Sequence, residues 1–194
     1  MYTILLDSSN TELSVGLAKE GILLDFISYE AWQQQSEFMV KELDKLLSAF
    51  KVKNEGIKDI IVSIGPGSYT GVRIALTIAK TIATALNICV YPVSSLRVKK
   101  QNNNPSICLI NARSNRSYIG VYAGKRIILE DTIMSNDDIK KYIDEHPNYV
   151  VCGDTAYLGV EGYKSNVLEQ ALSLYPYLEK CESALGLKPV YLKD

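Results

Sequence analysis

The residue types that could hold an anion or a metal ion gather first in residues 6–11. Within this segment Asp7 could hold a hydrated magnesium ion, and the amides of the turn could surround an anion. The alternative is that Asp7 and Ser8 close a hairpin by bonding the amides of their own turn. We favour the hairpin, because a single carboxylate without acidic partners is weak support for a metal site.

A second candidate is the glycine-rich segment of residues 61–74. Gly67 allows a sharp turn, Ser68 can cap the helix that follows, and free amides at a helix start can bind phosphate. The segment has no Gly-Lys pair at the P-loop spacing, and Thr70 stands where a GxGxxG motif needs its third glycine. It therefore predicts a tight strand-to-helix corner.

A third candidate is Arg113, which ends a strand-like run near the junction of the two halves. Its planar guanidinium could bind a loop carboxylate, a partner or a nucleotide, and the sequence does not choose among them. His146 is the only histidine, and the four cysteines contain no CxxC pair. We therefore expect no metal site in this chain.

Charge and hydropathy exclude two broad classes of function. The chain has 21 basic and 22 acidic residues, whereas a protein that binds nucleic acid by itself usually shows a basic excess or stripe. No apolar run approaches the roughly 20 residues that cross a bilayer. The first seven residues lack the basic start of a signal peptide, so we expect a cytoplasmic protein without membrane contact.

The elements that position these residues follow one order twice. Strands are expected at residues 3–9, 12–19, 22–30, 59–64 and 88–93, then at 107–112, 118–123, 126–134 and 149–152, with helices at 36–50, 70–86, 136–145 and from about 165. A repeated β-β-β-α-β-α unit predicts the α/β, actin-like ATPase (ASKHA) fold, with two ribonuclease-H-like lobes that each contain a mixed sheet. A polar linker places the lobes at residues 1–100 and 101–194, the second one shortened.

The predicted helix at residues 70–86 is apolar over most of its circumference, apart from a stripe of threonines. Such a helix must be covered on more than one side. It could be buried within its own lobe, or it could form, with the helix at 36–50, a face for a partner's helices. The residues expected at this partner interface are Ser36, Met39, Val40, Leu43, Leu47, Thr70, Arg73, Ile74, Thr77, Ile78 and Thr81.

Eight short motifs extend over nearly the whole chain. They are Ile4-Leu5-Leu6-Asp7-Ser8, Ser14-Val15-Gly16-Leu17, Gln35-Ser36-Glu37, the glycine-rich decapeptide of residues 65–74, Val93-Ser94-Ser95-Leu96, Asn111-Ala112-Arg113, Gly153-Asp154 and Pro189-Val190-Tyr191-Leu192-Lys193. With these motifs the sequence resembles the TsaB (YeaZ) family, the non-catalytic members of the bacterial machinery that makes threonylcarbamoyladenosine next to the anticodon of tRNA. Gln35 and Asn111 stand where that family has histidine and aspartate.

The resemblance implies a catalytically degenerate subunit that binds TsaD, its catalytic paralogue, through the two helices. TsaD would hold metal and nucleotide, TsaE would act as the ATPase, tRNA would bind the whole complex, and the chain would form a homodimer when TsaD is absent. No catalytic residue, metal or tightly bound cofactor is then expected here, although Asp7, Ser8, Gly67, Ser68 and Arg113 remain candidates for a nucleotide- or anion-proximal position.

Three alternatives to this interpretation can be weighed, and the second of them is excluded. An active ATPase or small-molecule kinase of the same fold needs acidic metal ligands in both lobes and a second glycine-rich loop, and the second half offers only Gly153-Asp154. A zinc peptidase needs two histidines on one helix face, which a single histidine excludes. A self-contained homodimer with a structural role is the third.

Overall fold

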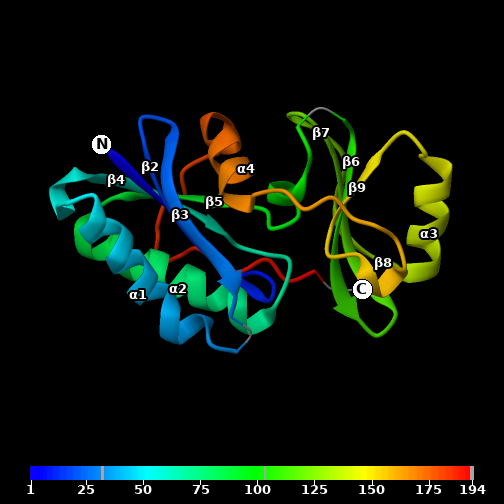
Figure 1. Cartoon of the computed structure of the whole chain (residues 1–194), viewed down its shortest axis with the longest axis horizontal. Helices are drawn as coiled ribbons and strands as arrows, with labels where there is room; N and C mark the ends of the chain where they lie inside the picture. Colours follow the sequence, from blue (N-terminus) through cyan, green and yellow to red (C-terminus); the bar gives the residue numbers. More distant parts are fainter. Residues whose placement is uncertain (32, 103, 193–194) are drawn as a thin grey trace.

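The computed structural model describes residues 1–31, 33–102 and 104–192. Two β-sheets lie side by side, each with helices packed against it (Figure 1). The first lobe contains β1 (Tyr2–Asp7), β2 (Glu12–Lys19), β3 (Ile22–Glu30), α1 (Gln35–Ala49), β4 (Ile57–Ser63), α2 (Tyr69–Leu86) and β5 (Cys89–Val93). Its sheet has the order β3-β2-β1-β4-β5, in which β1, β2 and β3 are antiparallel and β4 and β5 run parallel to β1.

The second lobe contains β6 (Ser106–Arg113), β7 (Arg116–Ala123), β8 (Arg126–Ser135), α3 (Asn136–Glu145) and β9 (Val150–Gly153). Its sheet has the order β8-β7-β6-β9, with β9 parallel to β6. The Ser135 side chain caps α3 by accepting a hydrogen bond from the Asp138 amide. The order of strands and helices along the chain is therefore the predicted one, and both sheets are mixed.

The last helix, α4 (Val167–Leu174), lies against the first sheet rather than the second (Figure 1). Leu168 and Ala171 pack with Leu5 and Ile61 on the face of the sheet opposite α1 and α2. Because β1 and β4 are apolar on both faces, the sheet needs a cover on each side, and α4 provides the second. The predicted boundary between the lobes after residue 100 stays a prediction, but the chain from α4 onward packs on the first lobe.

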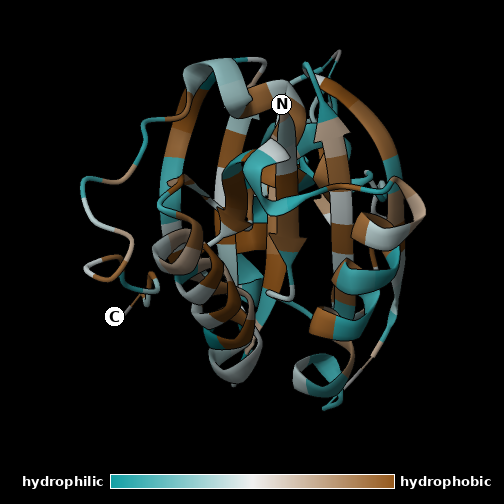
Figure 2. Cartoon of the chain, turned by 90° about the vertical axis from the view of Figure 1, so that its left-hand side faces the viewer, coloured by the Kyte–Doolittle hydropathy of each residue, from teal (hydrophilic) through white to brown (hydrophobic). Residues whose placement is uncertain are grey.

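The C-terminal tail, residues 178–192, continues along α2. The Cys181 amide donates to the Val90 carbonyl (2.9 Å) and the Val190 amide donates to the Ile64 carbonyl (2.7 Å). The Lys80 ammonium donates to the Leu185 carbonyl, which ties the middle of the tail to α2. Figure 2 shows apolar strands through the middle of this lobe and the tail descending along the outer side of α2. Part of the apolar surface of α2 is thus covered by the chain itself. Lys193 of the last motif lies outside the described residues.

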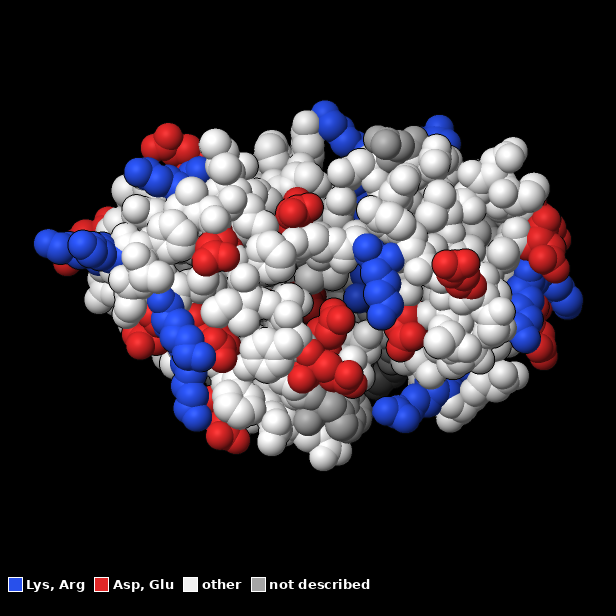
Figure 3. All heavy atoms as spheres, in the orientation of Figure 1, with Lys and Arg blue, Asp and Glu red and all other residues white. Residues whose placement is uncertain are grey.

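The surface shown in Figure 3 carries acidic and basic side chains interspersed, with no continuous basic stripe on that face. Among the helices in the described part of the chain, none is long and apolar enough to cross a membrane.

Candidate functional site

The glycine-rich corner before α2 is filled by the protein's own backbone. The Ser68 amide donates to the Ser9 carbonyl (2.7 Å), and the Ser8 hydroxyl donates to the Gly71 carbonyl (2.7 Å). A Cβ on Gly71 would lie 1.9 Å from the Ser8 carbonyl oxygen, and one on Gly67 would lie 2.2 Å from that of Ser9. These two glycines are therefore required because the β1–β2 turn presses against the start of α2. The corner is the tight strand-to-helix connection that the sequence predicts.

Asp7 closes its own turn, as the hairpin interpretation predicts. Its buried carboxylate accepts hydrogen bonds from the Ser9 amide (3.1 Å) and the Ser9 hydroxyl. Ser68 accepts from the Gly71 amide, so the cap of α2 is also internal. The structure brings Asp7, Ser8, Gly67 and Ser68 together in this corner. Their nearness to a nucleotide or another anion stays a prediction.

Arg113 lies elsewhere, at the end of β6 in a turn where its φ is +65°. Its side chain is exposed, and its amide donates to the Asn111 side chain (2.8 Å). Within residues 1–31, 33–102 and 104–192, no hydrogen bond or ion pair joins the Arg113 guanidinium to the corner. Its expected role at the junction of the lobes stays a prediction.

An apolar groove of about 420 Å³ runs between α1 and α2. Its lining residues are Ser36, Val40, Tyr69, Thr70, Arg73, Ile74, Thr77 and Ile78. Val40 is 53% exposed and Tyr69 is 60% exposed, although both are large apolar side chains. An exposed apolar groove between two helices is a surface that a partner's helix or side chains can fill.

Most of the residues predicted for a partner interface lie at or beside this groove. Leu47 is half-buried against the core, and Thr81 is exposed one turn beyond Thr77. Met39 and Leu43 require a correction, because both side chains are buried in the core cluster between the sheet and the two helices. They form the inner stripe of α1, and Val40 lies on the exposed flank beside that stripe. A side chain already packed inside the lobe has no surface to offer a partner.

Tyr69 is a groove residue that the sequence reasoning missed. Arg73 donates a hydrogen bond to its hydroxyl, and the Arg73 guanidinium lies 4.9 Å from the centre of its ring. The Tyr191 ring stacks on it with centroids 5.1 Å apart. A signal was present, since an aromatic residue at the first position of α2 follows a serine cap and precedes the apolar stripe. The end of the tail therefore contributes to one edge of the groove.

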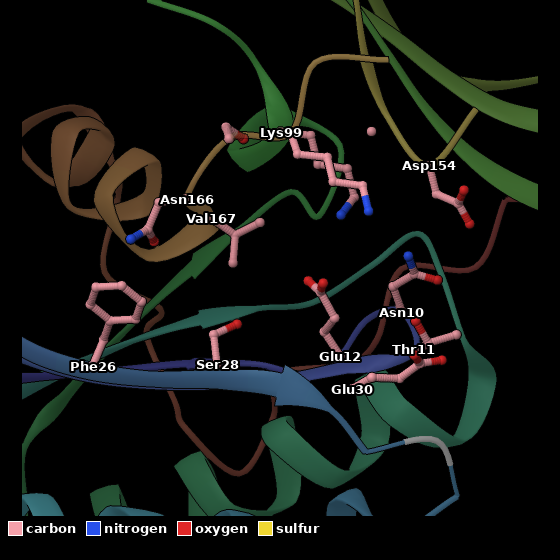
Figure 4. Close-up of a pocket in the computed structure, with 13 residues that line it drawn as sticks. Asn10, Thr11, Glu12, Phe26, Ser28, Glu30, Lys99, Asp154, Asn166 and Val167 are labelled. Carbon is pink, nitrogen blue, oxygen red and sulfur yellow. The ribbon is translucent and has the colours of Figure 1, made fainter. Parts of the chain in front are cut away.

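A second hollow, of about 490 Å³, lies between the two lobes (Figure 4). The first lobe contributes Glu12 and Glu30, the 3₁₀ turn η2 (Arg97–Lys99) contributes Lys99, and the end of β9 contributes Asp154. Of the predicted motifs, Gly153-Asp154 thus lines this cleft. In the part of the chain that the structure describes, no group of three or more His, Cys, Asp or Glu residues is arranged to hold a metal ion.

Buried polar groups lie near the junction of the lobes. Burial lowers the pKa of Lys100, and the nearby Arg97 charge lowers it further; its ammonium donates to the Gln170 side chain (3.2 Å). Burial also raises the pKa of Asp131, although the Ser94 hydroxyl donates to that carboxylate. The first contact joins the residue after η2 to α4, and the second joins the segment after β5 to β8 of the second sheet.

The two adjacent lobes with mixed sheets, together with the order of their elements, define an α/β protein of the actin-like ATPase (ASKHA) class. YeaZ from Pseudomonas aeruginosa has this fold, with a TM-score of 0.82 over 98% of this chain and 99% of that one at 23% identity. The family model of TsaD, tRNA N6-adenosine threonylcarbamoyltransferase, matches residues 28–148.

Curated relatives agree with this match. The TsaB protein of Bacillus subtilis is 33% identical over 69% of this chain and 60% of its own length. A Mycoplasma genitalium protein described as uncharacterized is 30% identical over the whole of this chain and 95% of its own length. The chain belongs to the TsaB (YeaZ) family, as its motifs predict.

Proposed function

We propose that this chain is a non-catalytic subunit that binds TsaD and supports the formation of threonylcarbamoyladenosine next to the anticodon of tRNA. The observation that carries this proposal is the exposed apolar groove between α1 and α2. Membership of a family whose curated relatives are described as tRNA threonylcarbamoyladenosine biosynthesis proteins supplies the reaction.

The groove suits a helix of TsaD for two physical reasons. Its floor is apolar, with Ile74 and Ile78 half-buried, so a partner's apolar side chains would gain burial there. Its rim includes Thr70, Thr77 and Arg73, whose hydroxyls and guanidinium can bond polar groups at the edge of a contact. A helix pair from TsaD against α1 and α2 would form a four-helix contact.

In this proposal the chemistry belongs to the partner subunits. TsaD holds the metal ion and the nucleotide, TsaE hydrolyses ATP, and tRNA binds the assembled complex in the cytoplasm. This chain contributes a surface and no catalytic group. When TsaD is absent, the same groove would pair with a second copy, because the apolar surface otherwise stays in water.

Reconstitution of tRNA modification tests the proposal. TsaD, TsaE and the enzyme that supplies the activated threonylcarbamoyl group are incubated with unmodified tRNA, with or without this chain, and the modified nucleoside is measured by mass spectrometry. We expect modification only when the chain is present. Equal yields without it would contradict a supporting role, and failure of the chain to bind TsaD in calorimetry would contradict the interface.

A further inference from the structure

Two carboxylates lie opposite each other in the interlobe cleft. Glu12 on β2 and Glu30 on β3 are direct cross-strand partners in an antiparallel pair. Both are exposed, and neither makes an ion pair with any residue that the structure describes. Like charges directly opposite each other destabilise a sheet. Such a local conflict is expected where the residues serve a site rather than the fold.

Lys99 approaches the same cleft from the other wall. The residue is only 9% exposed, and its side chain extends into the cavity in Figure 4. Its ammonium has no hydrogen bond or salt bridge to a residue in the described ranges. The Lys99 ammonium is therefore available to a ligand anion, and a hydrogen bond between two charged groups is among the stronger ones.

The cleft is charged at one end and apolar at the other. In Figure 4, Asn10, Glu30 and Asp154 lie at one end, whereas Phe26 lies toward the start of α4, with Val167 between them. Phe26 is 42% exposed, so its ring is available for contact. The cavity of about 490 Å³ is within the range of small-molecule sites.

We propose that this cleft binds a free α-amino acid with a large apolar side chain. The ligand carboxylate pairs with Lys99, the ligand ammonium lies between Glu12 and Glu30, and the side chain packs on Phe26. The ligand carboxylate and the ligand ammonium are each paired with an opposite charge, and the apolar side chain of the ligand is removed from water. This site is separate from the α1–α2 groove and goes beyond the function proposed above.

The charges of the cleft disfavour a nucleotide. Its lining residues include three carboxylates, those of Glu12, Glu30 and Asp154, and two ammonium groups, those of Lys99 and Lys164. A nucleoside di- or triphosphate would bring several negative charges next to the acidic pair, whereas a zwitterion adds no net charge.

Calorimetric titration of the full chain with four amino-acid compounds, and with ADP as a competitor, tests the ligand class. L-Phenylalanine and L-leucine are expected to bind. N-Acetyl-L-phenylalanine lacks the ammonium, and L-phenylalaninamide lacks the carboxylate, so each is expected to bind at least tenfold more weakly than L-phenylalanine. Absence of L-phenylalanine binding, or equal binding of the acetylated compound, overturns the proposal. Binding of ADP in competition with L-phenylalanine, at equal or higher affinity, overturns it as well.

Two variants tie the binding to the named side chains. Glu30→Gln and Lys99→Met are each expected to weaken L-phenylalanine binding at least tenfold, whereas Glu55→Gln, an exposed acid in the turn before β4, is expected to leave it unchanged. Glu30→Gln should also raise the melting temperature, because it removes the repulsion from Glu12. Since Glu30 is exposed, this variant is expected to fold even if Lys99→Met does not. Unchanged affinity in Glu30→Gln would refute the assigned contact.

Discussion

Val40→Glu separates the surface of α1 from its buried face. Val40 is 53% exposed on the rim of the groove, so a glutamate there stays in water in the free chain and should fold normally. In a complex with TsaD the same side chain would be covered. Burial of a whole valine side chain contributes roughly 1.5–3 kcal/mol, so the loss of its remaining half costs about 1 kcal/mol of binding free energy.

The new carboxylate has a greater effect on binding than the lost apolar contact. Leaving a polar or charged group buried without a partner costs on the order of 2 kcal/mol or more. The two effects together predict a loss of about 3 kcal/mol of binding free energy, which raises the dissociation constant roughly 100-fold. Calorimetric titration with TsaD measures this value. Ser48→Glu, which places the same charge on an exposed position of α1 outside the groove lining, is the matched control.

The decisive outcome is the ratio of the two affinities. If Val40→Glu binds TsaD as tightly as Ser48→Glu while circular dichroism and melting temperature show intact folding, the groove is not the binding surface. The location of the interface would then be refuted, although the family membership would stand.

Three further predictions concern the fold. Leu43→Ala should lower the free energy of unfolding by about 2–5 kcal/mol in urea denaturation, because it leaves a cavity in the core, and a loss below about 1 kcal/mol would contradict the buried position. Gly71→Ala should destabilise the chain by about 1–3 kcal/mol or more because its Cβ meets the Ser8 carbonyl, whereas Gly56→Ala, with no contact below 3.5 Å, should be tolerated. Burial lowers the pKa of Lys100 in the folded chain below its ordinary value of 10.5. Between these two pKa values the unfolded chain binds more protons than the folded chain, so the free energy of unfolding should rise with pH. Urea denaturation across this pH range should show the rise in the parent chain and a smaller one in Lys100→Met.

The strands and helices of this fold follow from local sequence patterns. Alternation, apolar runs and turn residues predict the elements of both lobes, and the apolar circumference of α2 predicts that it needs more than one cover. It is harder to predict which side of α1 faces the sheet. A 3.6-residue period defines an apolar stripe, but Met39 and Val40 are both apolar and adjacent in the chain, so the pattern does not say which of them is buried. Only packing shows that Met39 faces the core and Val40 the groove.

Contacts between segments far apart in the chain could not be predicted from local sequence patterns. The packing of α4 on the first sheet depends on which uncovered sheet face the chain can reach. Nothing in the local sequence around Leu168 or Leu5 predicts that these two residues are in contact. The opposition of Glu12 and Glu30 follows from strand register, but the position of Lys99 across from them depends on how the lobes are set side by side. A site formed between two lobes is therefore the feature that is hardest to predict from such a sequence.

The tail and the groove are connected through one aromatic pair, which gives a last prediction. Tyr191 stacks on Tyr69 at the edge of the groove, and Arg73 bonds the Tyr69 hydroxyl. An aromatic pair contributes roughly 0.5–1.5 kcal/mol beyond area burial, so Tyr191→Ala should lower stability by about 1 kcal/mol. Tyr69 would also lose the ring that holds it in place.

Because a side chain that must be ordered on binding costs about 0.5–1.5 kcal/mol, Tyr191→Ala should weaken TsaD binding about two- to tenfold, far less than Val40→Glu. Leu185→Ala, at an exposed position in the same tail, should change neither affinity nor stability by a comparable amount. Equal effects of the two tail variants would mean that the tail acts only as a cover for α2. A selective effect of Tyr191→Ala would show that the tail also positions Tyr69 in the groove. The tail would then have two roles, because it covers the outer side of α2 and also shapes the surface that binds TsaD.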